Sequence, residues 1–329
     1  MYIGIYMKFI ELKSHDPYLN LAIEEYIFKN AEEETFILWQ NEPCIVIGKN
    51  QNPFAEINIP IAREKNVKIV RRITGGGAVY HDLGNVNYSF ISPSHKEGID
   101  FAYFTSPIIK ALSSLGVSCT LSGRNDLVLK NGRKISGNAQ HSSLGRVLHH
   151  GTLLFSSDLD VLDSLLNVDA EKLKSKAVRS VRSRVANISD SLDFPCSLTD
   201  FISSIKRMLA EEYLATEVRA PDNAEIQLIR ERNSSDEWIF NEKEYLSVYN
   251  IKVRNRFDFG TVECNIKLKG DYISDIRITG DFFEKRPIEE LEERLIGKSI
   301  TSTNLDNCNV SDYILGMSNS DFLHLLKDL

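Results

Sequence analysis

A long apolar run is missing from this sequence. In 329 residues no hydrophobic stretch approaches the roughly 18 residues that a membrane-spanning helix needs. The opening segment MYIGIYMKFI is too short to cross a bilayer and lacks the cleavage pattern of a signal peptide, so it predicts a first strand. We therefore expect a cytoplasmic protein with no membrane partner.

Cysteine is scarce and follows no pattern. The five cysteines form no C-x-x-C pair and are scattered along the chain, at Cys44, Cys119, Cys196, Cys264 and Cys308. An odd number without paired spacing argues against a disulfide framework and against a zinc site. His81 and the pair His149–His150 have no third residue at metal-ligand spacing, so we predict hydrogen-bonded histidines and no structural metal.

An excess of positive charge is also absent. The formal net charge of -7 would repel a nucleic-acid backbone, so we expect no nucleic-acid partner, and any anionic ligand must be held by local positive charge. The hydrophobic content of 42% and the charged content of 26% are typical of a globular protein. The length favours one large domain and a smaller one, and a monomer is expected.

Residue patterns predict a mixture of helices and strands. Helical spacing favours helices over residues 17–30, 55–66, 105–115, a segment ending near 173, and 198–213. AVYHD and NVNYSFIS alternate like two paired strands around a turn at residues 82–85. Asn131-Gly132, between two strand-like arms, predicts a type I′ hairpin that places Lys134 just past a tight turn.

Motifs become sparse after about residue 190. From residue 245 onward, alternating strands turned at residues 269–271 and two later helical segments predict a small α+β module. We therefore predict an α+β fold, with a large domain over residues 1–246 and a small accessory domain over residues 253–329. The large domain is expected to contain a mixed, mostly antiparallel sheet flanked by helices, and the strand order is not readable from the sequence.

A glycine-rich segment, RRITGGGAVYHD, covers residues 71–82. Three consecutive glycines after a strand let backbone N–H groups approach an anion closely, and two arginines enter the same loop. The alternative is a turn that merely lets strands cross at short range. The segment matches neither a P-loop nor a dinucleotide-binding fingerprint, which disfavours both ordinary nucleotide folds.

A second segment carries a lysine with small neighbours. Lys134 precedes ISGNAQ and follows SGRND, and HHGT lies on a later strand. One cation beside a ligand cleft could offset the repulsion between an attacking carboxylate and an α-phosphate, which is about 4 kcal/mol at ~4 Å and an effective dielectric of ~20. Considered by its surroundings alone, Lys134 is better explained as a solvated hairpin lysine.

In these segments the sequence resembles the lipoate-protein ligase family. RRITGGGAVYHDLGN is similar to the family's lipoate-binding loop, and SGRNDLVL with GRKISGNAQ resembles its nucleotide and catalytic-lysine segments. HHGTLLF and KSKAVRSVRSRVANI complete the series in the family's order, so the resemblance covers about residues 15–190. The trailing module is similar in size and position to the family's accessory C-terminal domain.

The resemblance implies a set of site residues. Lys134 matches the family lysine that contacts both the carboxylate and the α-phosphate, and Asp126 is expected to bind Mg²⁺ through ATP. Residues 176–184, whose basic character would otherwise indicate a solvated face, match a loop that closes over the adenine side. Besides Lys134, the implied residues for binding ATP and lipoyl-AMP are Arg72, Gly75, Gly76, Gly77, Ala78, Val79, Tyr80, Asn125, Asp126, Ser136, Gly137, His150, Gly151, Thr152, Arg179, Val181 and Arg182.

The resemblance also implies a reaction. Lipoate and MgATP would give lipoyl-AMP, and the lipoyl group would pass to a lysine of a lipoyl domain in an E2 subunit of a 2-oxoacid dehydrogenase or of the glycine cleavage H protein. One alternative is a lipoyl or octanoyl transferase of the same fold that needs no ATP and often forms a cysteine thioester. Others are a transferase that receives preformed lipoyl-AMP, a biotin ligase, and a silent binding module.

Overall fold

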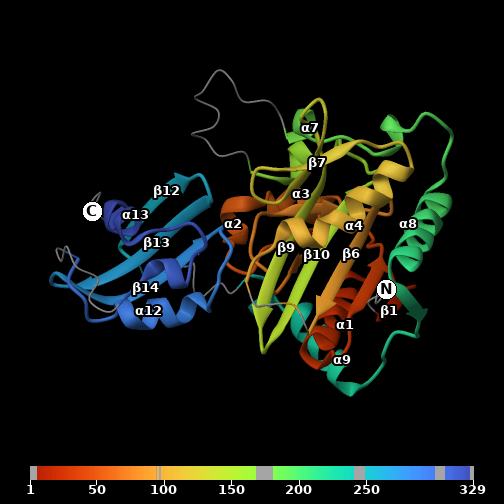
Figure 1. Cartoon of the computed structure of the whole chain (residues 1–329). Helices are drawn as coiled ribbons and strands as arrows, with labels where there is room; N and C mark the ends of the chain where they lie inside the picture. The colour runs from red at the N-terminus through yellow and green to blue at the C-terminus, as the bar shows by residue number, and fades with distance from the viewer. Residues whose placement is uncertain are drawn as a thin grey trace.

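The computed structural model describes residues 6–93, 95, 98–167, 181–240, 249–300 and 308–326, with only the backbone described at residues 181 and 182. Two units lie side by side, and the smaller one, drawn in blue, holds the C-terminal part of the chain (Figure 1). Within the described residues, no helix is both long and apolar enough to cross a membrane.

The larger unit is built on an eight-stranded sheet. Its order is β11-β1-β2-β6-β10-β9-β8-β7. The strands are β1 (Tyr6–Glu11), β2 (Thr35–Trp39), β6 (Asn85–Ser92), β7 (Cys119–Ser122), β8 (Asp126–Leu129), β9 (Lys134–Ser143), β10 (Arg146–Leu154) and β11 (Leu214–Glu217). Strand β1 pairs in parallel with β11 and β2, and the other neighbours are antiparallel. The predicted mixed, mostly antiparallel sheet is thus confirmed.

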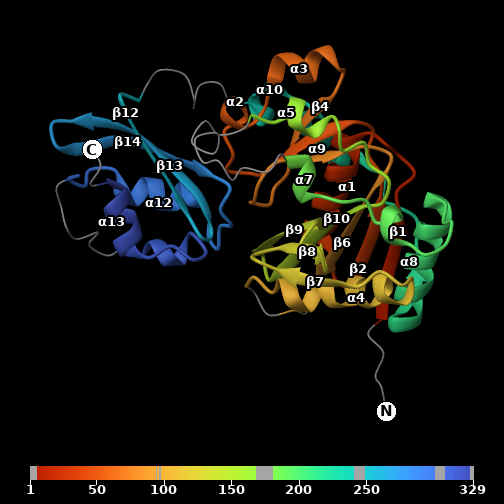
Figure 2. The ribbon, with the colours of Figure 1, turned by 90° about the horizontal axis from the view of Figure 1, so that it is seen from above.

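Helices cover both faces of this sheet (Figure 2). Helices α1 (Pro17–Asn30) and α9 (Ala224–Asn233) pack on one face, and α4 (Phe101–Ser114) and α8 (Leu198–Glu212) pack on the other. Alternation along β2 explains the division, because successive side chains of a strand point to opposite faces. Phe36 and Leu38 join the core under α4 and α8, whereas Ile37 and Trp39 join the core under α1.

A separate three-stranded sheet has the order β4-β3-β5. Its strands are β3 (Cys44–Ile47), β4 (Lys68–Arg71) and β5 (Val79–His81). The short helices α2 (Pro53–Glu56), α3 (Ile59–Glu64), α5 (Leu162–Leu165), α7 (Val181–Arg184), α10 (Asp236–Ile239) and the 3-10 turn η1 (Ser189–Ser191) complete the larger unit's described elements.

The predicted pairing of residues 78–82 with 85–92 is wrong. Strand β5 pairs with β3, whereas β6 pairs with β2 and β10 in the other sheet. The Asp82 side chain accepts hydrogen bonds from the backbone N–H groups of Gly84 (2.9 Å) and Asp158 (2.7 Å). This turn leads the chain from one sheet into the other, and hydrophobic alternation cannot show that.

Two predicted helices have different bounds. The helix expected over residues 55–66 is two short helices, because Asn52 and Asn58 each cap a new N-terminus by accepting from Phe54 N–H (3.0 Å) and Ile61 N–H (3.4 Å). Helix α4 begins at Phe101 rather than Thr105, since Asp100 accepts from the N–H group of Tyr103 at 2.9 Å. The helix predicted to end near residue 173 extends into residues outside the described part of the chain.

The hairpin between β8 and β9 is present, but the type I′ turn is wrong. The N–H group of Gly132 donates to Leu129 O at 2.8 Å, and that of Leu129 donates to Arg133 O at 2.9 Å, which gives a three-residue loop. Gly132 has φ +78°, whereas Asn131 lacks the positive φ that type I′ requires. Lys134 still follows the turn directly, as the first residue of β9.

The smaller unit is a three-stranded antiparallel meander covered by helices. It comprises β12 (Ile251–Phe257), β13 (Gly260–Lys269), β14 (Tyr272–Gly280), α12 (Ile288–Leu295), the 3-10 turn η2 (Val310–Asp312) and α13 (Asn319–Leu326). Val262, Leu291 and Phe322 are fully buried in its own hydrophobic core. Residue 253, where we expected the accessory domain to begin, lies inside β12.

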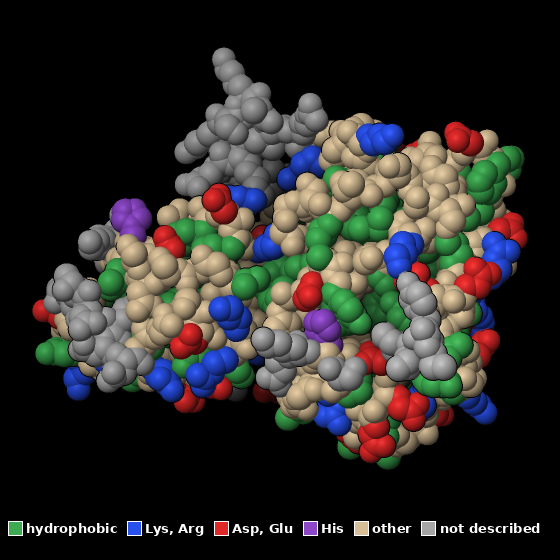
Figure 3. Space-filling model, in the orientation of Figure 1, with side chains coloured by type: hydrophobic (Ala, Val, Ile, Leu, Met, Phe, Trp, Pro, Cys, Tyr) green, Lys and Arg blue, Asp and Glu red, His purple; other side chains and the backbone are tan. Residues whose placement is uncertain are grey.

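The two units meet at the segment that follows β14. Gly280 N–H donates to Asn50 O at 2.8 Å, and the Glu284 carboxylate accepts from Lys49 Nζ at 2.8 Å and from Asn50 Nδ2 at 3.2 Å. Lys and Arg side chains, in blue, lie at this junction in the space-filling view (Figure 3). The smaller unit is therefore fastened to the loop that follows β3.

Candidate active site

A cavity of about 600 Å³ lies between the two sheets of the larger unit. Its lining residues come from β2, β6, β10, β9 and β8, which are consecutive neighbours in the eight-stranded sheet, and from the β3 and β5 side. Ligand pockets of small molecules have volumes of about 300–1,000 Å³. The cavity is thus large enough for a nucleotide-sized or fatty-acid-sized ligand.

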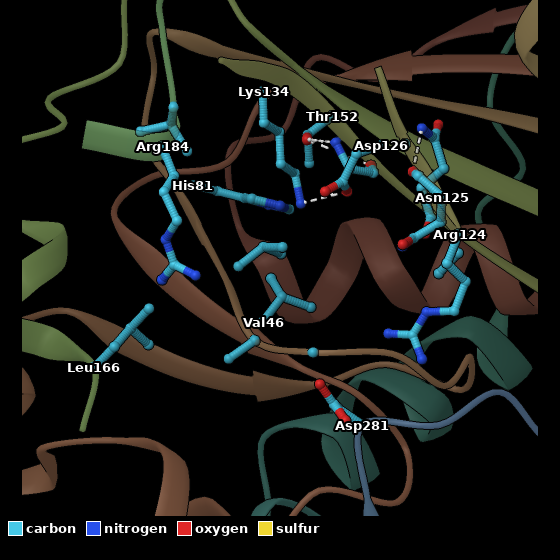
Figure 4. Close-up of a pocket in the computed structure, with 18 of the residues that line it drawn as sticks. Val46, His81, Arg124, Asn125, Asp126, Lys134, Thr152, Leu166, Arg184 and Asp281 are labelled. Carbon is cyan, nitrogen blue, oxygen red and sulfur yellow. Dashed lines mark hydrogen bonds and ion pairs between the residues drawn. The ribbon is translucent and has the colours of Figure 1, made fainter. Parts of the chain in front are cut away.

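Lys134 reaches into this cavity from the start of β9 (Figure 4). Its Nζ lies 2.8 Å from Asp126 Oδ1 on the neighbouring strand. A Cβ at Gly137 would lie 2.6 Å from Lys134 Nζ, so the lysine lies across that glycine and any other residue there would displace it. The backbone of Lys134 is also bridged to Val185, and Ala186 N–H donates to Lys134 O at 2.8 Å.

The glycine-rich segment forms part of the opposite wall through Gly77, Ala78 and Val79. Gly76 has φ +88°, and its N–H group donates to Phe282 O of the smaller unit at 3.1 Å. A Cβ at Gly75 would lie 2.5 Å from Phe282 O. The first two glycines therefore permit contact with the smaller unit, while the third borders the cavity.

Arg72 supports this wall from beneath. Its Nη2 donates to Gly75 O (2.7 Å) and Gly77 O (2.9 Å), its Nη1 donates to Val46 O (3.0 Å), and its Nε donates to Thr74 Oγ1 (2.9 Å). Burial lowers the pKa of Arg72 to about 10, with Glu24 opposing the shift. The planar guanidinium thus fixes the loop conformation through several carbonyls at once, which a lysine could not do.

A buried relay continues from Thr74. His150 Nε2 lies 2.8 Å from Thr74 Oγ1, and His150 Nδ1 lies 2.9 Å from Glu24 Oε1, which also accepts a hydrogen bond from Ser89 Oγ. Glu24 is 1% exposed. Since the Arg72 Nε–H group occupies one lone pair of the threonine oxygen, the Thr74 hydroxyl keeps its proton and its other lone pair for the contact with His150 Nε2. The relay places a compensating carboxylate behind the buried arginine.

His81 offers a hydrogen-bond donor to the cavity. Asn41 Nδ2 lies 3.0 Å from His81 Nδ1, and Asn20 Nδ2 donates to Asn41 Oδ1 at 2.9 Å, so the amide of Asn41 is oriented as a donor. Burial lowers the pKa of His81 to about 3, so the imidazole is neutral and carries its proton on Nε2. That nitrogen is buried without a protein partner, and His81 lines the cavity.

The structure brings many of the predicted residues together. Those that line the cavity are Arg72, Gly77, Ala78, Val79, Asn125, Asp126, Lys134, Gly137, His150, Gly151 and Thr152. Gly75 and Gly76 instead contact the smaller unit, Tyr80 packs in the core of the three-stranded sheet, and Ser136 is buried beside Asn138. Arg179 lies outside the described residues, as does most of the predicted closing loop, and at Val181 and Arg182 only the backbone is described.

Several cavity residues were not predicted. These are Trp39, His81, Asn87, Arg124, Arg256 and Asp281, whereas Arg184, which also lines the cavity, belongs to the closing loop predicted over residues 176–184. Arg124 and His81 lie inside motifs that the sequence displayed, so their neighbours could have pointed to them. Arg256 and Asp281 lie on the smaller unit, where no motif marks them, and only the three-dimensional arrangement brings them to the site.

Comparisons with known proteins agree with this arrangement of fold and cavity. Residues 16–210 match the family model of the lipoyl protein ligase A/B catalytic domain, and residues 247–326 match that of the bacterial lipoate protein ligase C-terminus. The chain is 40% identical over 337 residues to a lipoate-protein ligase of Bacillus subtilis, covering 97% of this chain and 100% of the relative. It is 41% identical to lipoate-protein ligase 1 of Staphylococcus aureus, covering 88% and 90%.

Solved structures share the fold. A P. falciparum protein solved in complex with lipoate superimposes with a TM-score of 0.74 at 21% identity, covering 89% of this chain and 90% of that one. A bipartite ligase of Thermoplasma acidophilum, described together with its E2 lipoyl domain, gives 0.62 at 24% identity, covering 76% and 100%. A lipoate-protein ligase A bound with ATP gives 0.60 at 23% identity, covering 72% and 99%.

The fold, the cavity and these matches together define the class of the protein, which is a ligase. The chain belongs to the lipoate-protein ligase family, and the resemblance seen in its sequence is confirmed.

Proposed function

We propose that this enzyme is an ATP-dependent lipoate-protein ligase. It adenylates lipoate to lipoyl-AMP and then transfers the lipoyl group to a lysine of a lipoyl domain. The observation that carries the proposal is Lys134, held by Asp126 in the cavity and facing a wall of glycine-rich backbone. Relatives named as lipoate-protein ligases, and fold neighbours solved with lipoate or with ATP, support the choice of substrates.

In the first step a carboxylate oxygen of lipoate attacks the α-phosphorus of ATP. A new P–O bond forms, the bond to the β-phosphate oxygen breaks, and pyrophosphate leaves with the electron pair. Lys134 lies between the two anions and offsets their repulsion, while the positioned cavity walls hold the reacting atoms in line. Asp126 holds the ammonium group at the cavity wall before substrates bind.

The lipoyl tail occupies the apolar part of the cavity. Trp39 on β2 and Leu21 on α1 line that part, together with Val46 and Val79 from the three-stranded sheet. Burial of the apolar tail contributes roughly 0.8 kcal/mol per methylene group. Enclosure also keeps water from the mixed anhydride until the acceptor arrives.

In the second step the neutral ε-amine of an acceptor lysine attacks the carbonyl carbon of lipoyl-AMP. An amide bond forms, AMP leaves with the electron pair of the broken C–O bond, and the amine releases a proton. The acceptors we propose are lipoyl domains of E2 subunits and the glycine cleavage H protein. One fold neighbour was solved with its E2 lipoyl domain, which supports this class of partner.

Mg²⁺ is expected with ATP, and the cavity wall fits it in a limited way. Among the described residues no group of three His, Cys, Asp or Glu side chains could hold a metal ion by itself. Asp126 is one carboxylate on the wall, and Mg²⁺ usually binds one or two carboxylates together with substrate phosphates and water. Asp126 would hold the ion, whose positive charge supplies neutralisation of the phosphates.

An acyltransferase that forms a cysteine thioester is less compatible with this site. No cysteine lines the described cavity. Burial raises the pKa of Cys119 to about 11 and raises the pKa of Cys44 even further, whereas a nucleophilic thiol needs a lowered pKa. The ATP-dependent reaction is therefore the better assignment.

The proposal is tested with Lys134→Ala. Purified protein receives lipoate, MgATP and a lipoyl domain, pyrophosphate is measured, and the acceptor is weighed by intact mass. We expect Lys134→Ala to lose at least about 100-fold in pyrophosphate release, since its charge acts on the transition state. Lys130→Ala, an exposed residue of the same hairpin, is the matched control. Normal pyrophosphate release by Lys134→Ala would refute the assigned role.

We also propose a domain boundary at residues 247–250, directly before β12, and a monomer. Light scattering during size-exclusion chromatography measures the mass of the particle, and limited proteolysis followed by mass spectrometry locates the boundary. A dimeric mass, or first cleavage within the smaller sheet, would contradict these assignments.

A further inference from the structure

We propose that Arg124 of the larger unit and Arg256 of the smaller unit together bind the β- and γ-phosphates of ATP. The smaller unit would then supply one of the side chains that bind the pyrophosphate leaving group. This inference rests on the proposed function.

The Arg124 guanidinium stacks on an aromatic ring, and one of its nitrogens has no hydrogen-bond partner among the described residues. Its Nη1 is buried and unpartnered, and the guanidinium carbon lies 4.7 Å from the centroid of the Phe283 ring. Phe283 belongs to the smaller unit and packs against Phe101 at a centroid distance of 5.2 Å. The arginine is therefore positioned by ring stacking, which leaves donors available to an anion in the cavity.

The hairpin between β12 and β13 brings the second arginine to the same place. Arg256 is paired with Thr261 in this hairpin and lines the cavity. A Cβ at Gly260 would lie 2.7 Å from Arg124 Nη1 and 2.9 Å from Asp281 Oδ1, so the hairpin tip lies directly against Arg124. Gly260 has φ +142°, which lets the chain turn at this contact.

The positive charge of Arg124 and Arg256 is only partly compensated by nearby carboxylates, which indicates an anion site. Burial lowers the pKa of Arg124, Asp281 and Asp126 oppose that shift, and Arg256 adds to it by repulsion. The Asp281 carboxylate already accepts a hydrogen bond from Thr261 N–H at 2.5 Å, and Asp126 is paired with Lys134. Figure 4 shows Arg124 extending from the side of Asn125 and Asp126 toward Asp281. A multiply charged phosphate chain placed between the two arginines would relieve their repulsion.

Of all the groups on lipoate and ATP, the β- and γ-phosphates are the ones that remain for Arg124 and Arg256 to bind. Lys134 is assigned to the carboxylate and the α-phosphate, and the apolar wall around Trp39 is assigned to the lipoyl tail. These two assignments leave the negative charge of the β- and γ-phosphates without a cationic side chain. Arginine forks match phosphate oxygens in a bidentate manner, and such charge-assisted hydrogen bonds are stronger than neutral ones. Lipoyl-AMP lacks both terminal phosphates, so its use in the second step should not depend on this pair.

The experiment separates the two half-reactions in the full-length enzyme. Arg256→Met removes the charge from an exposed side chain, so the variant should fold. Arg254→Met, an exposed residue two positions earlier on the same face of β12, is the matched control. Pyrophosphate release is measured over a range of MgATP concentrations, and lipoyl transfer is measured separately from synthetic lipoyl-AMP to a lipoyl domain by intact mass.

We expect Arg256→Met to raise KM for ATP and to lower kcat/KM for adenylation by about 10- to 100-fold, the effect of a lost hydrogen bond between charged groups. Inhibition by added pyrophosphate should weaken by a similar factor, Arg256→Lys should restore part of both, and transfer from lipoyl-AMP should change less than about twofold. Equal losses in both half-reactions, or no loss in either, would overturn the inference. Failure of the proposed function is distinguishable, because the unmodified enzyme would then release no pyrophosphate and modify no acceptor.

Discussion

Burial controls the protonation of two histidines, His149 in the core and His81 at the cavity. His149 is fully buried among Tyr88, Phe101 and Phe104, and neither ring nitrogen has a protein hydrogen-bond partner. Burial lowers its pKa well below 6.5, as it lowers the pKa of His81 to about 3. The unfolded chain therefore binds protons on these rings at pH values where the folded chain does not, and acid favours unfolding.

The sign and the size of this effect can be measured. Between pH 6.5 and pH 5, a histidine that stays neutral in the folded state costs about 2 kcal/mol of unfolding free energy, from 1.36 kcal/mol for each pH unit. We measure the free energy of unfolding in urea at pH 7 and at pH 5. Between these pH values, His149→Phe should lose about 2 kcal/mol less unfolding free energy than the unmodified enzyme. His324→Gln, on the exposed surface, is the control. An unchanged pH dependence in His149→Phe would contradict the buried neutral ring.

Single residues were predictable where their signal is local. Lys134 follows its turn directly in the sequence, and Gly77 with its two successors lies in one continuous motif, so both could be placed at a site. Glu24 could not, because its meaning depends on His150 and Arg72, which are distant in the chain and meet it only after folding. His81 was visible in the motif, but its donor role depends on Asn41.

At the scale of elements, the glycine-rich wall depends on a close approach of two loops. A Cβ at Gly48 would lie 2.0 Å from the carbonyl oxygen of Gly76, a distance that real side chains do not reach. The loop after β3 and the loop after β4 are therefore matched to each other through glycine. The sequence displayed the triple glycine but gave no sign that the single Gly48 is equally constrained.

Gly48→Ala tests this contact. The added methyl group must push the Gly76 carbonyl away, so we expect a loss of about 2–4 kcal/mol in unfolding free energy and a decrease of at least about 10-fold in pyrophosphate release. Gly145→Ala is the control, because Gly145 has nothing within 4 Å of the added atom, so this variant bears only the backbone cost of an alanine at its positive φ (+71°). It should lose only about 1 kcal/mol. Urea unfolding of the two variants decides, and equal losses would count against a steric match.

The elements themselves were predicted best where periodicity acts over many residues. The helix over residues 17–30 and the one starting at Leu198 were found in place, because each carries an apolar stripe that faces the large sheet. The pairing of β5 and the break between α2 and α3 were missed. In both places short polar side chains, Asp82 and Asn58, redirect the backbone, and such local hydrogen bonds override a hydrophobic pattern.

At the scale of the whole molecule, the attachment of the smaller unit depends on a buried charge. Glu284 accepts hydrogen bonds from Lys49 and Asn50 and is 6% exposed. Burial raises the pKa of Glu284, an effect that Lys49 opposes. Since the segment around Glu284 also carries Asp281 to the cavity, the attachment and the nucleotide side of the site are mechanically connected.

Reversing the charge of Glu284 should weaken the attachment of the smaller unit and, with it, the adenylation reaction. In Glu284→Lys two ammonium groups would face each other about 3 Å apart in a buried position, which is strongly unfavourable. We expect faster hydrogen exchange at residues 48–51 and at the segment after β14, together with a decrease of at least about 10-fold in adenylation. Glu290→Lys, at a partly exposed position on α12 where the carboxylate pairs with Arg286, should change neither. The double exchange Lys49→Glu with Glu284→Lys restores an opposite pair and should recover both measurements. If the double variant stayed as impaired as Glu284→Lys, the ion pair would not be what holds the smaller unit over the site, and the backbone bonds of Gly76 and Gly280 would have to account for the attachment.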